Sequence, residues 1–191
     1  MQKLYLKLAL NLKLFIFAFA LLPTVIYSQP SLHTDRYDKY FKSSASRWMP
    51  GISYKWLKAQ CWQESRFKRY AVSPAGAKGF CQFMPKTADE VAIALKSFPS
   101  PFNIKWSIEA AAYYDGRMLR FWKTKRPLQD KINLALASYN AGAGNIAKAQ
   151  KRCDMAVLYE DIIRCLPQIT KHHSKETIDY VFRIGQYYKS L

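Results

Sequence analysis

Apolar residues recur three and four positions apart along most of the chain, and β-branched residues do not alternate with polar ones over any long window. This spacing places side chains on one face of an α-helix, whereas strict alternation is typical of a strand. The pattern therefore predicts an all-α protein without internal repeats. Helices are expected at 35–48, from 53 through 64, at 87–96, 107–123, 130–142, 155–165 and 175–189, and their expected capping residues are Ser53, Thr87 with Glu90, Ser107, Asp130 and Ser174.

The first 28 residues differ in kind from the rest. They contain three lysines, no acidic residue and an apolar run from Leu14 to Leu22, which is followed by Pro23 and the small residue Ser28. This is the layout of a signal peptide, and we expect cleavage near Ser28. The run is shorter than the roughly 20 apolar residues of a membrane span, so a retained anchor is the weaker alternative. The expected organisation is a signal peptide at 1–28, an N-terminal extension with a short helix at 29–52, and one domain at 53–191.

Length and charge narrow the class of function. The chain has 191 residues, half of them hydrophobic, which suffices for one domain with a core and excludes a disordered tail. The formal charge is +17, and about +14 without the first 28 residues, so an anionic partner is expected. Because an exported protein meets cell-wall polymers and membrane surfaces, nucleic acid is not an expected partner.

The chain contains four cysteines, Cys61, Cys81, Cys153 and Cys165. An even number in an oxidising compartment favours two disulfides, for which three connectivities exist. The pairs Cys61–Cys81 and Cys153–Cys165 are preferred because each closes a short loop; free buried thiols are the alternative. No CxxC motif occurs, and adjacent histidines at 172 and 173 cannot share a helical face, so no metal site is expected.

Glu64 is the single acidic residue of the stretch 63–85. It shares one helical stripe with Trp56, Leu57, Gln60 and Cys61, so it is turned toward the core rather than toward water. Burial disfavours the charged form of a carboxyl and raises its pKa, which suits a general acid. An ion pair with Arg66 or Lys68 is the alternative.

The segment after this helix is rich in residues that permit tight turns. Gly76 and Gly79 allow positive φ, Ser73 precedes a proline, and Gln82 offers both an amide donor and an acceptor. We expect these residues to form a polar wall over Glu64. A helix connection that binds no ligand is the alternative.

Three segments carry a resemblance to a known family. They are Glu64-Ser65 with Ala71-Val72-Ser73-Pro74, Gly76-Ala77-Lys78-Gly79, Gln82-Phe83-Met84-Pro85 and Thr87; then ASYNAG at 137–142; then LPQIT and ETIDYV within 166–181. In this order they resemble the soluble lytic transglycosylases of the SLT type, which are peptidoglycan lyases, over roughly 53–188. The resemblance implies a lysozyme-like single catalytic domain with a substrate groove and helices joined by short loops.

The resemblance also implies a role for each matching residue. Glu64 would be the catalytic acid, and Tyr180 would hydrogen-bond near it and help set its protonation. The implied substrate-binding residues are Ser65, Ser73, Gln82, Tyr139, Asn140 and Tyr180. From the sequence without the resemblance, the better interpretation is that the two tyrosines are core aromatics and that Asn140 is part of a helix terminus.

One position departs from the family pattern. Where the family usually has Gly-Leu-Met-Gln, this chain has Gly79-Phe80-Cys81-Gln82. The methionine that would line the sugar groove is therefore replaced by Cys81. A bridge from Cys81 to Cys61 would tie the Gln82 segment to the Glu64 helix.

Glycoside cleavage commonly uses two carboxylates, whereas the matching motifs offer one. The other candidates, Asp89, Glu90, Glu109, Asp115 and Asp130, are expected at caps and on solvated faces. The resemblance implies that the substrate supplies the nucleophile: Glu64 protonates the oxygen between N-acetylmuramic acid (MurNAc) and N-acetylglucosamine (GlcNAc), and then accepts the proton of the MurNAc C6 hydroxyl as it attacks C1. The expected product is a 1,6-anhydro-MurNAc end, formed without metal or cofactor.

Two alternatives to a lyase remain. A lysozyme-type hydrolase would use water in place of the C6 hydroxyl, and a non-catalytic glycan-binding or assembly protein would keep only the fold, although the presence of Glu64 disfavours it. Expected partners are peptidoglycan strands and anionic envelope polymers in the periplasm or cell envelope. Wall remodelling and a secretion, conjugation or phage apparatus are all compatible contexts.

Overall fold

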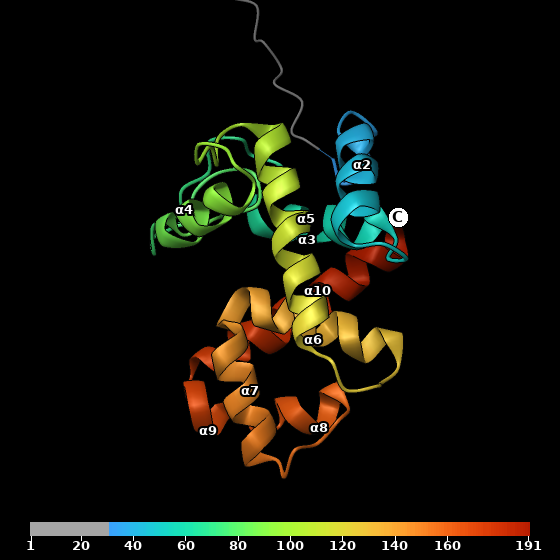
Figure 1. The fold of residues 1–191 in the computed structure, drawn as a ribbon, viewed down its shortest axis with the longest axis vertical. Helices are drawn as coiled ribbons and strands as arrows, with labels where there is room; N and C mark the ends of the chain where they lie inside the picture. Colours follow the sequence, from blue (N-terminus) through green and yellow to red (C-terminus); the bar gives the residue numbers. More distant parts are fainter. Residues whose placement is uncertain (1–30) are drawn as a thin grey trace, which may run out of the picture.

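The structure is a computed structural model that describes residues 31–191, so the expected signal peptide lies outside the described residues. The helices are α2 (Asp38–Trp48), α3 (Tyr54–Ser65), α4 (Pro85–Ala94), α5 (Ile104–Phe121), α6 (Leu128–Ala141), α7 (Ala143–Arg152), α8 (Tyr159–Ile163), α9 (Pro167–Thr170) and α10 (His173–Ser190) (Figure 1). Within 31–191, β-type pairing is limited to two isolated bridges. The all-α prediction is confirmed. No helix of the described part combines the length and hydropathy needed to cross a membrane.

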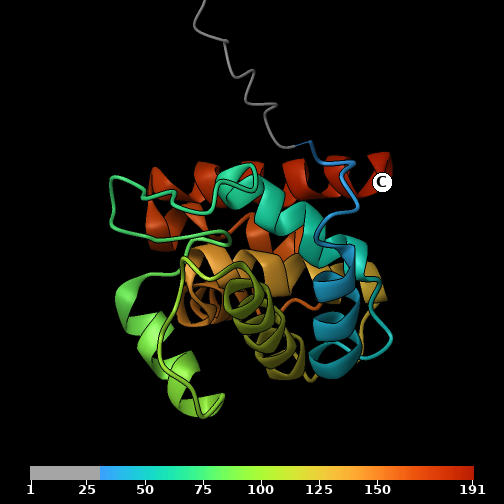
Figure 2. The same ribbon diagram turned by 90° about the horizontal axis from the view of Figure 1, so that it is seen from above.

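The core is organised around the long helix α5. Helices α2 and α6 pack along it, and α3 packs against both α2 and α10; Figure 2 shows α3 and α10 lying side by side. Close contact of α2 with α5 depends on Gly116, where a Cβ would lie 2.2 Å from the carbonyl oxygen of Trp48. Phe41, Ala45 and Met49 are buried in the same core, so α2 packs with the rest of the protein. The boundary drawn at residue 53 stays a prediction.

Most helices begin at residues other than the predicted capping residues. Ser53 does cap α3, since its Oγ accepts a hydrogen bond from the backbone N–H of Lys55 (3.4 Å). Ser107, however, lies inside α5, which the Asn103 side chain caps by accepting from Trp106 N (3.1 Å). The prediction of a Ser107 cap is therefore wrong. Its buried hydroxyl instead accepts a hydrogen bond from Cys81 N (3.0 Å).

Three further helices begin earlier than predicted. Helix α4 starts at Pro85 rather than at a Thr87 cap, because proline is favourable in the first turn. Helix α6 starts at Leu128, and Asp130 accepts from Tyr159 N (2.6 Å) instead of capping its own helix. Helix α10 starts at His173, and Ser174 Oγ donates to Lys171 O (2.7 Å). These side chains join segments that lie far apart or close a preceding turn.

The region after Gly142 contains more helices than predicted. Gly142 ends α6 with a φ of 85°, as its expected position indicates, but α7 begins at the next residue. The helix expected at 155–165 is reduced to the short α8, and α9 was not predicted.

Two disulfides connect these elements, and they are the pairs that close short loops. Cys61–Cys81, the loop disulfide, joins α3 to the segment before α4. Cys153–Cys165, the distal disulfide, joins the end of α7 to the segment after α8. Every cysteine of the described residues is in a disulfide.

Candidate active site

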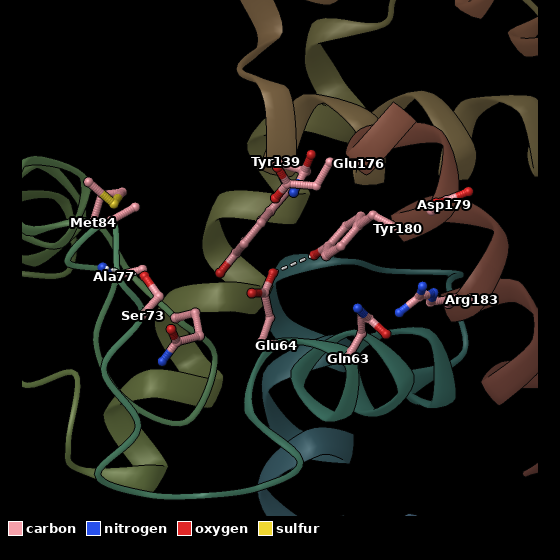
Figure 3. A pocket seen from close by; sticks show the side chains of 13 residues that line it. Gln63, Glu64, Ser73, Ala77, Met84, Tyr139, Glu176, Asp179, Tyr180 and Arg183 are labelled. Carbon is pink, nitrogen blue, oxygen red and sulfur yellow. Dashed lines mark hydrogen bonds between the residues drawn. The ribbon is translucent and has the colours of Figure 1, made fainter. Parts of the chain in front are cut away.

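A cavity of about 480 Å³ opens between the end of α3, the 66–84 loop that follows it, α6 and α10 (Figure 3). Its lining residues are Gln63, Glu64, Ser73, Ala75, Ala77, Gln82, Met84, Tyr139, Asn140, Glu176, Asp179, Tyr180 and Arg183. A second hollow of about 390 Å³ shares Asn140 and Glu176 with it. The two hollows are therefore adjacent, and together they are called the groove.

Glu64 is partly buried on the last turn of α3, and its carboxylate faces this cavity. The hydroxyl of Tyr180, on α10, donates a hydrogen bond to Glu64 Oε1 (2.6 Å), and Tyr139 points toward the same carboxyl from α6 (Figure 3). The contact between α3 and α10 thus brings together residues 116 positions apart. The ion pair considered from the sequence does not form: Arg66 donates to Tyr187 Oη (2.7 Å).

Desolvation by burial is the main cause that raises the pKa of Glu64 from 4.5 to about 8. The hydrogen bond from Tyr180 lowers the pKa, since it stabilises the carboxylate, and the negative charges of Asp115 and Glu176 raise it further. Near neutral pH, Glu64 therefore carries a proton while it remains open to the cavity. This is the state that a general acid requires.

The 66–84 loop is held rigidly beside Glu64. Lys78 and Phe83 exchange two backbone hydrogen bonds (2.9 Å each), and the loop disulfide ties Cys81 to α3. Gly79 has a φ of +84°, and a Cβ there would lie 1.9 Å from the carbonyl oxygen of Pro101. The glycine expected from the sequence is thus required both for its backbone conformation and for close packing.

Polar side chains of this loop form one wall of the cavity. Gln82 Nε2 donates to the carbonyls of Gly79 (2.8 Å) and Ala71 (3.1 Å), so its amide is fixed in orientation. Ser73 Oγ accepts from Ala77 N (3.0 Å). The hydrogen bonds place both side chains on the cavity side, as Figure 3 shows for Ser73.

Two residues of α6 form the opposite wall. Tyr139 donates to the carbonyl of Cys81 (2.8 Å), and its ring packs edge-on against Phe83. Asn140 Oδ1 accepts from Thr177 Oγ1 (2.7 Å). The structure thus brings Glu64, Ser73, Gln82, Tyr139, Asn140 and Tyr180 together around one cavity.

Ser65 is the predicted site residue that does not face the cavity. It is buried, and its hydroxyl donates to the carbonyl of Phe80 (2.7 Å). The physical reason is helical geometry, which rotates Ser65 by about 100° from Glu64. Its contact instead anchors the 66–84 loop to α3.

The sequence interpretation missed several lining residues. Gln63 lies at the end of α3, and Glu176, Asp179 and Arg183 lie on α10 (Figure 3). Helical spacing could have indicated two of them, because Glu176 and Arg183 are four and three positions from Tyr180. The cavity therefore contains carboxylates besides Glu64, contrary to the expectation of one.

Asp115 also differs from its prediction. It was expected on a solvated helix face, yet it is only 2% exposed, because α5 turns it toward α3. Gln60 Nε2 donates to Asp115 Oδ1 (3.2 Å). Desolvation raises the pKa of Asp115 from 3.8 to about 8, although the hydrogen bond from Gln60 lowers it.

The fold and the cavity agree with comparisons to known sequences. The sequence model described as "Transglycosylase SLT domain" matches residues 41–157. The chain belongs to this family. Among curated relatives, this SLT chain is similar to "Membrane-bound lytic murein transglycosylase F" of Shewanella pealeana and of Shewanella halifaxensis, each 30% identical over 166 residues, which cover 79% of this chain and 34% of the relative. The chain thus spans about a third of the length of the curated relatives it matches.

Solved structures of low sequence identity share the fold. The 70 kDa soluble lytic transglycosylase of Escherichia coli aligns with a TM-score of 0.64 at 21% identity, over 81% of this SLT chain and 24% of that chain. An inactive mutant of the lytic transglycosylase Slt from Pseudomonas aeruginosa aligns with a TM-score of 0.64 at 23% identity, with the same coverage. The lysozyme-like fold implied by the sequence resemblance is confirmed.

Proposed function

We propose that this chain is a lytic transglycosylase that cleaves the β-1,4 bond between MurNAc and GlcNAc in peptidoglycan and leaves a 1,6-anhydro-MurNAc end. One observation carries the proposal: Glu64 combines a pKa raised to about 8 with a carboxyl group that lines the 480 Å³ cavity. The names of the curated relatives and the family match point to the same class of substrate.

The proposed reaction uses Glu64 twice. The protonated carboxyl first donates its proton to the glycosidic oxygen, so the bond to MurNAc C1 breaks and the GlcNAc end leaves as an alcohol. The resulting carboxylate then accepts the proton of the MurNAc C6 hydroxyl as O6 bonds to C1. Water is not consumed, Glu64 ends protonated, and an intramolecular nucleophile at high effective concentration replaces an external one.

The walls of the groove would position the glycan for this step. Tyr180 holds one carboxyl oxygen of Glu64, which leaves the other for the glycosidic oxygen. Tyr139, Asn140 and Ser73 present polar atoms and an aromatic ring, which suit acetamido groups and sugar faces. Gln82 Nε2 is held by two backbone carbonyls, and the amide oxygen is a further acceptor for a sugar hydroxyl.

A lysozyme-type hydrolase is the second candidate, and Glu176 is the observation in its favour. This exposed carboxylate lines the same cavity from α10, where it could activate a water on the face of the sugar opposite Glu64. Asp179 is a poorer base, because the hydrogen bond from Lys175 (2.7 Å) lowers its pKa. A non-catalytic glycan binder would have no use for a protonated Glu64.

Product analysis separates these functions. Purified peptidoglycan is digested, and the soluble fragments are examined by mass spectrometry. Anhydro ends support the lyase, whereas reducing ends alone would overturn it in favour of the hydrolase. Glu64→Gln should abolish cleavage at unchanged fold, and Glu176→Gln should leave anhydro products in place; a hydrolase would instead lose activity in both variants.

The remaining expectations concern location and partners. We propose that the protein acts in the periplasm or cell envelope after export, and that its net charge of about +14 without the first 28 residues favours its retention near anionic envelope polymers. Secretion, conjugation or phage machinery would require such an activity to open the wall. Wall clearing in a strain that exports the chain, absent when the first 28 residues are deleted, would support the location.

A further inference from the structure

Asp115 is a buried carboxyl group that the proposed reaction does not use. It does not line the groove. Together with Gln60 it lines a separate small cavity of about 10 Å³, whose other walls are Met49, Trp56, Leu119, Ile132, Ala135 and Leu136. An ionised carboxylate in such apolar surroundings is unfavourable unless it is paired with a charge or with several donors.

Hydrogen bonding indicates the protonation state of this group. Gln60 Nε2 donates to Asp115 Oδ1 (3.2 Å), whereas Asp115 Oδ2 and Gln60 Oε1 are buried without a partner among the described residues. If Asp115 were ionised, both of these atoms would be acceptors that lack a donor. A proton on Asp115 supplies a donor within the pair and makes the group neutral, so the protonated acid is the form that the surroundings favour.

The hydrogen-bonded pair of Gln60 and Asp115 lies one helical turn before Glu64. Gln60 precedes Glu64 by four residues on α3, so the hydrogen bond from Gln60 to Asp115 fixes the helix one turn before the acid. A negative charge on Asp115 also raises the pKa of Glu64. Such coupling is mutual, because the free energy by which one charge opposes a second is the same for both groups.

Resting on the proposed role of Glu64 as acid, we propose that Asp115 is a positioning residue: as a neutral carboxylic acid it pairs with Gln60 and orients the last turn of α3, and once it ionises, its charge opposes the loss of the proton from Glu64. Ionisation of either carboxyl then disfavours ionisation of the other. Glu64 consequently stays protonated to a higher pH than it would beside a neutral amide.

The other ionisable groups around Gln60 and Asp115 do not supply a buried negative charge that would oppose ionisation of Glu64 in place of Asp115. Tyr114 on α5, Tyr139 on α6 and Tyr180 on α10 all have raised pKa values, chiefly because of burial, so they are uncharged near neutral pH. Glu176 on α10 contributes a negative charge toward Glu64 but is exposed to solvent. Met49, the residue directly after the neighbouring helix α2, adds an apolar side chain to the cavity.

Titration of carbon-13-labelled side-chain carboxyls by NMR tests the proposal without reference to activity. In the unmodified protein, the assigned Asp115 resonance should titrate above pH 7, and titration below about pH 6 would overturn the proposal. In Glu64→Gln, the same resonance should move to lower pH because its partner charge is gone. An identical Asp115 curve in the two proteins would also overturn the coupling.

Asp115→Asn supplies the converse test, since asparagine keeps both an acceptor for Gln60 and a donor. The titration of Glu64 and the alkaline limb of the cleavage profile should both move down by about half a pH unit or more. Asp89→Asn makes the same change at an exposed position of α4 and should move neither. If Asp115→Asn leaves the Glu64 curve unchanged, the proposal fails; if Glu64 titrates as expected but Glu64→Gln still cleaves, the proposed function fails instead.

Discussion

Replacing Tyr180 by phenylalanine should lower the maximum rate of wall cleavage and yet extend activity to higher pH. Tyr180 donates to Glu64 Oε1 at 2.6 Å, and this hydrogen bond lowers the pKa of the carboxyl against the larger effect of burial. Phenylalanine removes the donor while keeping the ring. The pKa of Glu64 must then rise, because the carboxylate loses more stabilisation than the neutral acid does.

The size of the shift follows from the hydrogen bond. A hydrogen bond to a charged group contributes about 1 kcal/mol more than one to a neutral group, which corresponds to about 0.7 of a pKa unit. From a pKa of about 8, the protonated fraction of Glu64 at pH 9 would rise from about one-tenth to about one-third. The rate at the optimum should fall about tenfold, since the carboxyl loses its fixed orientation.

Initial rates of turbidity loss of purified peptidoglycan, measured from pH 5 to pH 10, test this expectation. Tyr113→Phe is the matched control, because Tyr113 lies on α5 outside the groove. If the alkaline limb of the rate–pH profile moves to lower pH in Tyr180→Phe, or does not move, Tyr180 is not the hydrogen-bond donor to Glu64. A lower rate with an unchanged rate–pH profile would indicate that Tyr180 contacts only the glycan.

Three further outcomes are expected. The loop and distal disulfides join cysteines 20 and 12 residues apart, so changing either pair to alanine should lower the free energy of unfolding in urea by about 3 kcal/mol. Only loss of the loop disulfide should strongly reduce cleavage. Equal losses of cleavage activity in the two variants would contradict the role of the loop disulfide at the groove. Gly79→Ala should destabilise by about 3 kcal/mol or more because of the 1.9 Å approach to Pro101 O, whereas Gly76→Ala, with a similar φ and nothing within 4 Å, should cost about 1 kcal/mol. Glu64 has a folded pKa of about 8 against an ordinary 4.5, so the folded state binds an extra proton between these values and the protein loses stability as the pH rises from 4.5 to 8. Glu64→Gln should therefore unfold at a higher temperature than the unmodified protein, by a margin that widens across this pH range. A margin that stays constant with pH would argue against the raised pKa.

The parts of the site that could be predicted from the sequence are those that local geometry determines. Helical spacing was enough to turn Glu64 inward, and Gly79 could be recognised because few residues adopt its backbone conformation. The family resemblance supplied Tyr180, since no local signal links two residues 116 positions apart.

The errors arose where packing between helices decides the outcome. Asp115 has an unremarkable local sequence, and only the packing of α5 against α3 shows that it is buried beside Gln60. Ser107 was expected to cap a helix, but its hydroxyl instead serves the backbone of Cys81 (3.0 Å). Ser65 shares a motif with Glu64 and still faces the other way. Motif membership thus does not determine which way a side chain points.

Environment, rather than the number of acidic residues, distinguishes the acid of this groove. Asp179 also lines the groove, but the Lys175 hydrogen bond lowers its pKa and keeps it ionised. Asp115 has its pKa raised as far as Glu64 does, to about 8, yet it is buried and lines only a small, mostly apolar cavity. Glu64 alone among these three combines a raised pKa with access to the groove. A proton donor must satisfy both conditions at once, because burial without access cannot reach a substrate and access without burial leaves the carboxyl ionised.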